Sequence, residues 1–205
     1  VHDDCKEAVS DTAKILSQLG HEVEEAAPHY NHQSFAEAFV IIMAAHCAAF
    51  MEHIAKVCNR KLDNETLEQV NLWVLEKGRS HSAIDMANAM NAINVTCREV
   101  GKFFETYDIL VTPGLGTPPP PLGYMFADNE GNEVWDRMRS FTPFTHIFNG
   151  TGQPAMSVPA MLNDENIPIG IQLVGKYAED GLLIALAAQL EEARPWINNR
   201  PKIFA

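Results

Sequence analysis

One short segment constrains the fold of this chain more than any other. Residues 107–113, YDILVTP, form a continuous apolar run that ends at a proline, directly after a long stretch with helical periodicity. Such a run is typical of a strand that is covered on both faces, so the sequence predicts an interior strand at residues 108–112. The residues that follow, PGLGTPPPPLG, cannot join a regular ladder because proline lacks the amide hydrogen. They form either a linker between domains or a rigid loop that crosses the end of a sheet.

Helical patterns fill most of the chain before this strand. Apolar residues at helical spacing predict helices over residues 3–19, 34–57 and 64–77, of which the first ends at Gly20 and the third at Gly78. The helix at 34–57 is apolar most of the way round, and we expect it to be buried in the protein rather than to span a membrane. Between the first two helices, HEVEEAAP predicts a short edge strand at residues 22–26.

A further helix precedes the strand at 108–112, with Ser80 or Ser82 as its N-cap. It carries an apolar stripe at alternating spacings of three and four residues, which predicts core packing rather than a cofactor site. The stripe consists of Met86, Met90, Ile93, Cys97, Val100 and Phe104.

The last third of the chain mixes short helices with a hairpin. Helical stretches are expected near residues 135–139 and 143–148. AMSVPA and PIGIQLVG are two strands separated by the polar turn NDEN, which predicts a hairpin. A final helix begins at Ala178 or Asp180 and ends at Ala193, before Pro195. Helices that alternate with buried strands favour an α/β architecture with a mixed sheet.

Charge and composition exclude some classes of function. The 205 residues include 27 acidic and 15 basic side chains, a net charge of −12, and no cluster of basic residues, so we do not expect a nucleic-acid partner. Apolar residues make up 46% of the chain, enough for a core. We expect a soluble, cytoplasmic protein without a membrane partner, with its four cysteines reduced. The chain starts at Val1 without a leader, which suggests processing or a fragment.

Several residues invite a catalytic or metal-binding interpretation. His46 and His53 lie on one helix face but two turns apart, too far to chelate like an i, i+4 pair, and we expect no metal site. Ser157 lies in AMSVPA, without the Gly-x-Ser-x-Gly elbow of a nucleophile, so it is interpreted as a strand residue. GLG and GTG do not open a helix after a strand, as a phosphate site requires.

The segment FTPFTHIFNGTGQPA, residues 141–155, has a composition that suits the wall of a pocket. Gly150 and Gly152 permit unusual backbone dihedral angles, Pro154 fixes the entry to a strand, and aromatic rings precede them. A structured loop without a binding role explains the same residues equally well.

Five segments, in this order, resemble the C-terminal part of enzymes of the amidase signature family. They are VHDDCKEAVSDTAKILSQLGHEVEEAAP, YDILVTPGLGTPPPPLG, FTPFTHIFNGTGQPAMSVPA, IPIGIQLVG and DGLLIALAAQLE, and they look closest to bacterial amidases and cyclic-dimer lactam hydrolases. The resemblance implies an α/β fold in which strand 108–112 and strands near 155–159 and 169–174 belong to a large mixed β-sheet, with helices on both faces. It also implies that residues 1–205 are the C-terminal portion of an amidase domain, not a complete catalytic domain.

The family's chemistry is amide hydrolysis by a Ser, cis-Ser, Lys triad with backbone oxyanion donors and no cofactor. In such enzymes the triad lies in the N-terminal half, in and around a glycine- and serine-rich stretch. This sequence has no such stretch and no Ser-Ser pair, and none of Lys14, Lys56, Lys102 and Lys176 matches the family's lysine. We therefore expect no catalytic residue here and no activity of this chain alone. The alternative is a stand-alone, non-catalytic binding or scaffolding domain.

The resemblance also implies which residues line the substrate pocket. In the branch that amidates glutamyl-tRNA, an acidic residue that helps to hold the substrate stands at the position of Thr142, so we expect a neutral or apolar acyl group instead. Phe144 and Phe148 would supply apolar wall, and Asn149 would tie loop backbone together. The expected partners are a small-molecule amide substrate, the N-terminal half of the same protein and a possible second copy in a homodimer. The candidate pocket residues are Pro113, Gly114, Thr142, Phe144, Phe148 and Asn149.

Overall fold

The computed structural model of the protein describes residues 1–126 and 129–200, which form two compact units. The sheet unit contains the described residues of Val1–Ala27, Phe103–Pro119 and Phe144–Ala205. The helical unit contains those of Pro28–Lys102 and Pro120–Pro143. Along the chain, the division between Lys102 and Phe103 falls within helix α4, Ala83–Thr106.

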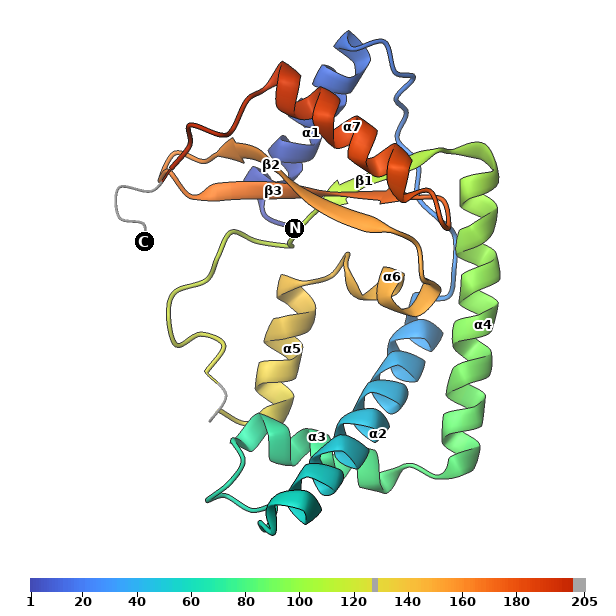
Figure 1. Ribbon diagram of the computed structural model, residues 1–205, viewed down its shortest axis with the longest axis vertical. Helices are drawn as coiled ribbons and strands as arrows, with labels where there is room; N and C mark the ends of the chain where they lie inside the picture. Colours follow the sequence, from blue (N-terminus) through green and yellow to red (C-terminus); the bar gives the residue numbers. More distant parts are fainter. Residues whose placement is uncertain (127–128, 201–205) are drawn as a thin grey trace. The chain divides into compact units, whose positions relative to one another are not determined.

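The sheet unit is built on an antiparallel sheet of three described strands, in the order β1-β3-β2 (Figure 1). The strands are β1, Ile109–Pro113, β2, Ala155–Leu162, and β3, Pro168–Gly175. The predicted hairpin is confirmed. The strand predicted at 108–112 forms as β1. Among the described strands β1 is an outer strand and β3 lies at the centre. Both segments are continuous apolar runs, and composition does not tell which of them pairs on both sides.

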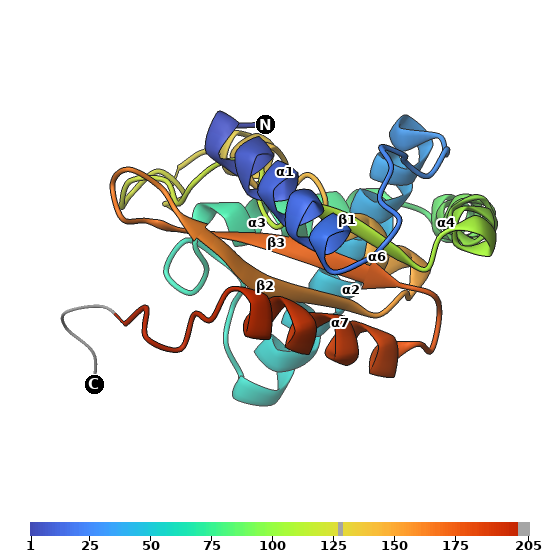
Figure 2. The same cartoon turned by 90° about the horizontal axis from the view of Figure 1, so that it is seen from above.

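Helices cover both faces of this sheet, as the α/β class implies. Helix α1, Asp3–Gln18, and helix α7, Asp180–Ala193, lie together on one face, and the short α6, His146–Thr151, lies on the other (Figures 1 and 2). Side chains on alternate residues of β3, namely Ile169, Ile171 and Leu173, pack against the two long helices. Each fully buried side chain of this kind contributes roughly 1.5–3 kcal/mol to folding.

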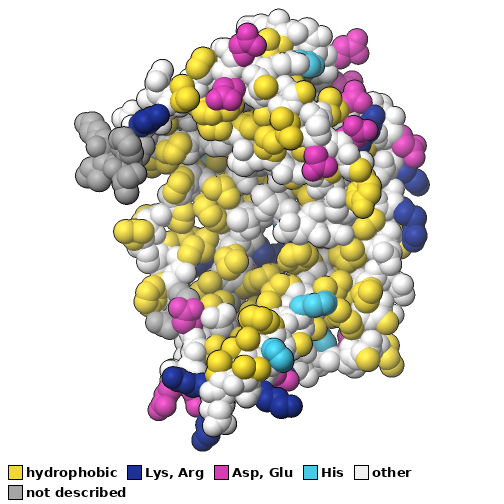
Figure 3. Space-filling view, viewed as in Figure 1, with side chains coloured by type: hydrophobic (Ala, Val, Ile, Leu, Met, Phe, Trp, Pro, Cys, Tyr) yellow, Lys and Arg dark blue, Asp and Glu magenta, His cyan; other side chains and the backbone are white. Residues whose placement is uncertain are grey.

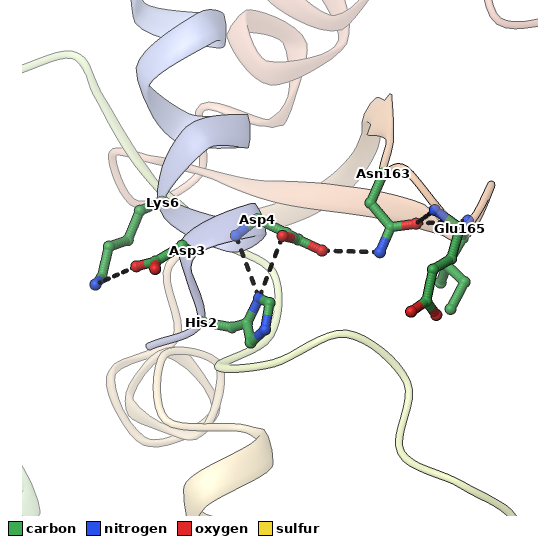
Figure 4. A network of polar contacts seen from close by, with 7 residues as sticks. His2, Asp3, Asp4, Lys6, Asn163 and Glu165 are labelled. Carbon is green, nitrogen blue, oxygen red and sulfur yellow. Dashed lines mark hydrogen bonds and ion pairs between the residues drawn. The ribbon is translucent and has the colours of Figure 1, made fainter.

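A polar network fixes the start of α1 to the turn between β2 and β3 (Figure 4). The Asp4 amide donates to His2 Nδ1 at 3.2 Å, so His2 is the N-cap. The Asn163 side chain donates to Asp4 Oδ2 at 2.8 Å, and its own oxygen accepts from the amides of Glu165 and Ile167 at 3.1 and 2.9 Å. One asparagine thus closes the turn and also binds the helix to it.

The strand predicted at residues 22–26 does not form. Residues 21–31 have no regular secondary structure, and the segment lies at the surface with Val23 exposed. Its glutamates give it no apolar face to bury, so a strand there would gain little. The Tyr107 hydroxyl donates to Glu24 instead.

The helical unit contains α2, His32–Cys58, α3, Gln69–Ser80, most of α4, and α5, Gly131–Phe141. Helix α3 was predicted at 64–77 and ends three residues later, with Gly78 inside it. A Cβ atom at Gly78 would lie 2.3 Å from the Ala44 oxygen, so glycine permits close approach of α2 and α3 rather than ending a helix. On the other side of α3, a Cβ at Gly131 would lie 2.2 Å from Cβ of Trp73.

Helix α2 is less buried than its composition predicted. Only Phe35, Ala38, Ala44 and Ala48 are buried, while Phe50 and Val57 are 66% and 68% exposed. Among the described residues, α2 is the one helix that is long and apolar enough to cross a membrane by length and composition, a property that core helices and signal sequences share. The expectation of a helix buried all round was therefore wrong for this chain.

Helix α4 begins as predicted but buries a shifted face. Ser82 is its N-cap, because the Asp85 amide donates to Ser82 Oγ at 3.1 Å. Of the predicted stripe, Val100 and Phe104 are buried, whereas Met90 is exposed. Ala89 and Thr96 are buried as well, so the covered face runs through smaller residues than the bulky apolar pattern indicated.

Candidate functional site

The sheet face that carries α6 presents a polar row, which we define as Thr112, Gln172 and Ser157. These residues are direct partners across β1, β3 and β2, so their side chains lie on the same face. The opposite face of the sheet is the apolar core beneath α1 and α7. The row is therefore the polar part of a sheet that is otherwise built mainly from apolar side chains.

Gln172 is the buried residue of this row and forms hydrogen bonds with two other segments. It is 5% exposed, and its Nε2 donates to Thr112 Oγ1 at 3.1 Å and to the Phe144 carbonyl at 3.2 Å. The Thr112 hydroxyl donates in turn to the Pro113 carbonyl at 3.1 Å. The amide thus connects the central strand, the outer strand β1 and the segment that precedes α6.

The first two candidate pocket residues lie where β1 ends. Pro113 pairs with Ile171 in the register, which sets its ring on the α1 and α7 side of the sheet rather than beside the polar row. The Gly114 amide donates to the Gly170 carbonyl at 3.1 Å, and a Cβ at Gly114 would lie only 3.2 Å from that oxygen. Glycine at this position therefore permits a close backbone approach.

The next candidates belong to the segment around α6, which begins three residues later than the predicted helix at 143–148. Phe144 is half-buried and supplies the carbonyl that Gln172 binds, and Phe148 is buried. Gly152 has φ +80° and donates to the Phe148 carbonyl at 2.9 Å, so it ends the helix in the left-handed conformation, as expected. Gly150 is helical and does not adopt a positive φ, which corrects the prediction for that residue.

The remaining two candidates have other surroundings. Asn149 is exposed, and its side chain makes no hydrogen bond with any residue that the structure describes, so the expected tie to loop backbone is not seen. Thr142 belongs to the helical unit, where it is the C-cap of α5. Its amide and hydroxyl both donate to the Met138 carbonyl, at 2.8 and 2.9 Å.

Ser157 has the surroundings of a structural residue rather than of a nucleophile. It is exposed on the outer strand β2, and within the described part of the chain no side chain is hydrogen-bonded to it. A nucleophilic serine needs a base within hydrogen-bond reach. The interpretation of Ser157 as a strand residue is confirmed.

Two lysines have the opposite of the environment that a catalytic base requires. Lys14 and Lys176 lie 2.8 Å from carboxylate oxygens of Asp11 and Asp108. The hydrogen bond to Asp11, with the attraction between the two charges, raises the pKa of Lys14 and keeps it protonated. Within residues 1–126 and 129–200, no three His, Cys, Asp or Glu side chains are grouped to hold a metal ion.

The sequence did contain a signal for Gln172 that our interpretation did not use. It is the only side chain in PIGIQLVG that forms hydrogen bonds, and it lies between two apolar residues. A lone amide in an apolar strand must find partners when it is buried, because an unsatisfied polar group there costs free energy. Such a residue indicates a specific polar contact across the sheet, although not which segment provides it.

Comparisons with known proteins agree with one another. A model of the Amidase family matches residues 1–184. The sequence is 32% identical over 185 residues to a Mycobacterium tuberculosis protein named as amidase AmiC, covering 90% of this chain and 38% of that protein. It is 27% identical over 210 residues to the 6-aminohexanoate-cyclic-dimer hydrolase of Paenarthrobacter ureafaciens, covering 98% of this chain and 42% of the hydrolase.

A comparison of structures also finds amidases. The structure matches that of a 6-aminohexanoate cyclic dimer hydrolase complexed with substrate, with a TM-score of 0.90 and 27% identity, over 98% of this chain and 44% of the hydrolase. The chain thus spans about two fifths of the length of the relatives that it matches. Its sequence, its antiparallel sheet with helices on both faces, and the match along residues 1–184 together show that the chain belongs to the amidase signature family.

Proposed function

We propose that the protein to which this chain belongs hydrolyses a carboxamide C–N bond, and that this chain is its C-terminal portion. The observation that carries the proposal is the match to an amidase family model along residues 1–184, by a chain that spans only about two fifths of its relatives. The sheet unit then supports one side of a substrate pocket. The other part of the protein contributes the reacting groups.

The proposed chemistry is that of a serine nucleophile. An unprotonated lysine, through a bridging cis-serine, removes the proton of the nucleophilic serine, whose oxygen attacks the amide carbonyl. Backbone amides stabilise the oxyanion, the C–N bond breaks, and the amine leaves with a proton. Water then hydrolyses the acyl-enzyme. The ion-paired Lys14 and Lys176 are unsuited to the role of the base, which supports a triad outside this chain.

We propose that the substrate has a neutral or apolar acyl group. Phe144 and Phe148 would form apolar wall on the α6 side of the sheet. The Thr142 hydroxyl donates within its own helix end and carries no charge that could pair with an ammonium group. A related hydrolase acts on the cyclic dimer of 6-aminohexanoate, so cyclic and linear amides are suitable first substrates to test.

The test uses the complete reading frame and, beside it, residues 1–205 alone. Both proteins are assayed on aliphatic, aryl and cyclic amides. We expect turnover by the complete protein and none by the 205 residues. Reproducible turnover by the shorter protein would contradict the proposal, and an inactive complete protein that lacks the glycine- and serine-rich stretch would favour a scaffolding domain.

A covalent probe locates the nucleophile independently of the substrate. The complete protein is treated with a fluorophosphonate, which reacts with activated serines, and the labelled peptide is identified by mass spectrometry. We expect the label outside residues 1–205. A label on Ser157 would overturn the assignment of that residue to the strand.

A further inference from the structure

The polar row connects the two segments of the sheet unit that contain candidate pocket residues. One segment is the end of β1 with Gly114, residues 112–114, and the other runs from Phe144 through α6. Gln172 lies between them on the central strand and binds both, to Thr112 Oγ1 at 3.1 Å and to the Phe144 carbonyl at 3.2 Å. Among the described residues of β3, it is the only side chain that donates hydrogen bonds.

The hydrogen bonds of Gln172 connect elements that are distant in the sequence, and we call this pair of bonds the brace. The residues that Gln172 binds are 60 and 28 positions away in the sequence. One amide nitrogen has two hydrogens, so a single side chain can serve both acceptors. Phe144 lies in the turn between α5 and α6 and belongs to no strand of the sheet. The hydrogen bond from Gln172 therefore attaches this turn to the central strand.

We infer that Gln172 is a positioning residue, which holds the Phe144–Phe148 wall against the sheet so that the wall keeps a fixed distance from β1. Gln172 acts through the Phe144 carbonyl and need not touch substrate. This inference rests on the proposed function for its catalytic consequence. The mechanical part, that Gln172 restrains residues 144–152, stands on the hydrogen bonds alone.

The first experiment compares three variants of the complete protein. Gln172→Met keeps the length of the side chain but removes both donors. Thr112→Val keeps the shape of the threonine and removes one acceptor. Gln189→Met is the matched control, because Gln189 is an exposed glutamine on α7 that contacts His21.

We expect Gln172→Met to raise KM about tenfold while kcat changes less than about threefold, since the lost restraint affects binding more than chemistry. Thr112→Val should give a smaller rise in KM, and Gln189→Met should match the wild type. Equal KM values for Gln172→Met and the wild type would overturn the inference.

A pH profile adds a readout that general loss of packing would not produce. Gln172→Glu has one donor when its carboxyl is protonated and none when it is ionised, and an ionised carboxylate would face the Phe144 oxygen. We expect the KM of this variant, relative to the wild type, to rise with pH as the carboxyl ionises, with burial raising the pKa of that carboxyl above its usual value. A pH-independent ratio would contradict the brace.

Hydrogen exchange separates this inference from the proposed function. In the complete protein, amides of residues 144–152 should exchange about tenfold faster in Gln172→Met than in the wild type, while those of α1 and α7 stay unchanged. This result holds whether or not the protein hydrolyses an amide. Unchanged exchange at 144–152 would overturn the inference, and if Gln172→Met does not fold, Thr112→Val and Gln172→Glu test the same restraint.

Discussion

Ile171 and Ile184 are the same residue type in opposite surroundings. Ile171 lies on the central strand beneath α1 and is 0% exposed, whereas Ile184 lies on the outer side of α7 and is 60% exposed. The two residues therefore separate the contribution of burial from that of side-chain identity.

We predict that Ile171→Ala lowers the free energy of unfolding by about 2–5 kcal/mol, because it removes buried methyl groups and leaves a cavity. Ile184→Ala is the control and should change it by no more than about 0.5 kcal/mol. Urea unfolding of the 205-residue chain, followed by circular dichroism, measures both values. Similar losses for the two variants would contradict the burial of Ile171.

Individual side chains show where inference from the sequence reaches its limit. Ser157 was correctly interpreted as a strand residue, because its local pattern alone excludes a nucleophile elbow. Gln172 was not singled out, because its importance depends on Phe144 and Thr112, which lie far away in the sequence. Local patterns describe a residue's own element, and they do not describe which distant backbone group its side chain will meet.

At the scale of elements, two helical glycines have opposite roles. Gly78 lies where α3 meets α2, and a Cβ there would lie 2.3 Å from the Ala44 oxygen and 2.5 Å from the Ala48 Cβ. Gly101 lies in α4, and a Cβ there would meet nothing within 4 Å. Alanine has a higher helix propensity than glycine at both positions. The two substitutions to alanine therefore differ only in how much space the added methyl group finds.

We predict that Gly78→Ala destabilises the chain by about 1–3 kcal/mol, because the added methyl group forces the two helices apart. Gly101→Ala should instead stabilise it by about 0.5–1 kcal/mol, since only the backbone entropy of glycine is removed. Thermal and urea unfolding of both variants provide the comparison. A stabilising Gly78→Ala would disprove the close approach of α2 and α3.

The hydrogen bonds at the start of α4 predict how stability depends on pH in acid. Asp85 Oδ2 accepts hydrogen bonds from the backbone amide and the hydroxyl of Ser82, both at 2.8 Å, and these bonds lower the pKa of Asp85. A pKa that is lower in the folded state gives stability that is present above the unfolded pKa of about 3.9 and is lost as the pH falls through the folded value.

The wild type should therefore lose melting temperature more steeply below about pH 4 than Asp85→Asn does, since the variant has no carboxylate to protonate. Ser82→Ala should weaken the same pH dependence by removing a donor. Melting curves between pH 6 and pH 3 measure the difference. Parallel curves for the wild type and Asp85→Asn would exclude this contribution.

The sequence predicted elements better than it predicted their ends and neighbours. Helix α1, the hairpin and α7 were correctly placed because each combines a clear periodicity with a distinct stop. The predicted helix at 64–77 begins instead at Gln69, because residues 64–66 form a turn, and ends at Ser80, because Gly78 serves interhelical packing rather than a helix end. The predicted strand at 22–26 had turn signals on both sides but no apolar face that a sheet could bury.

At the scale of the whole molecule, the most notable feature is exposed apolar surface. Figure 3 shows hydrophobic side chains among the polar ones on the face that it draws. Large exposed apolar residues occur on α2, on α4 and in residues 122–126, among them Phe50, Val57, Ile84, Leu122 and Phe126. On the proposal that this chain is the C-terminal portion of a longer protein, such surface is what the other portion would cover.

We predict that residues 1–205 alone bind a hydrophobic dye and associate as the concentration rises, and that the complete protein does so less. Phe50→Gln combined with Val57→Gln should reduce both effects, because the two side chains lie two turns apart on α2. Light scattering and dye fluorescence measure them. A monomeric 205-residue chain that binds no dye would contradict this prediction.

The order of the strands also determines when the sheet can form during synthesis on the ribosome. Strand β1 pairs only with β3 among the described strands, and β3 begins 55 residues after β1 has ended, at Pro168. Helix α1 precedes all three described strands in the chain, and β2 and β3, whose side chains pack against it, are made only after α6. Until β3 emerges, the nascent chain therefore carries α1 without its apolar partner strands and β1 without a pairing strand, a state in which chaperones bind and in which aggregation competes with folding.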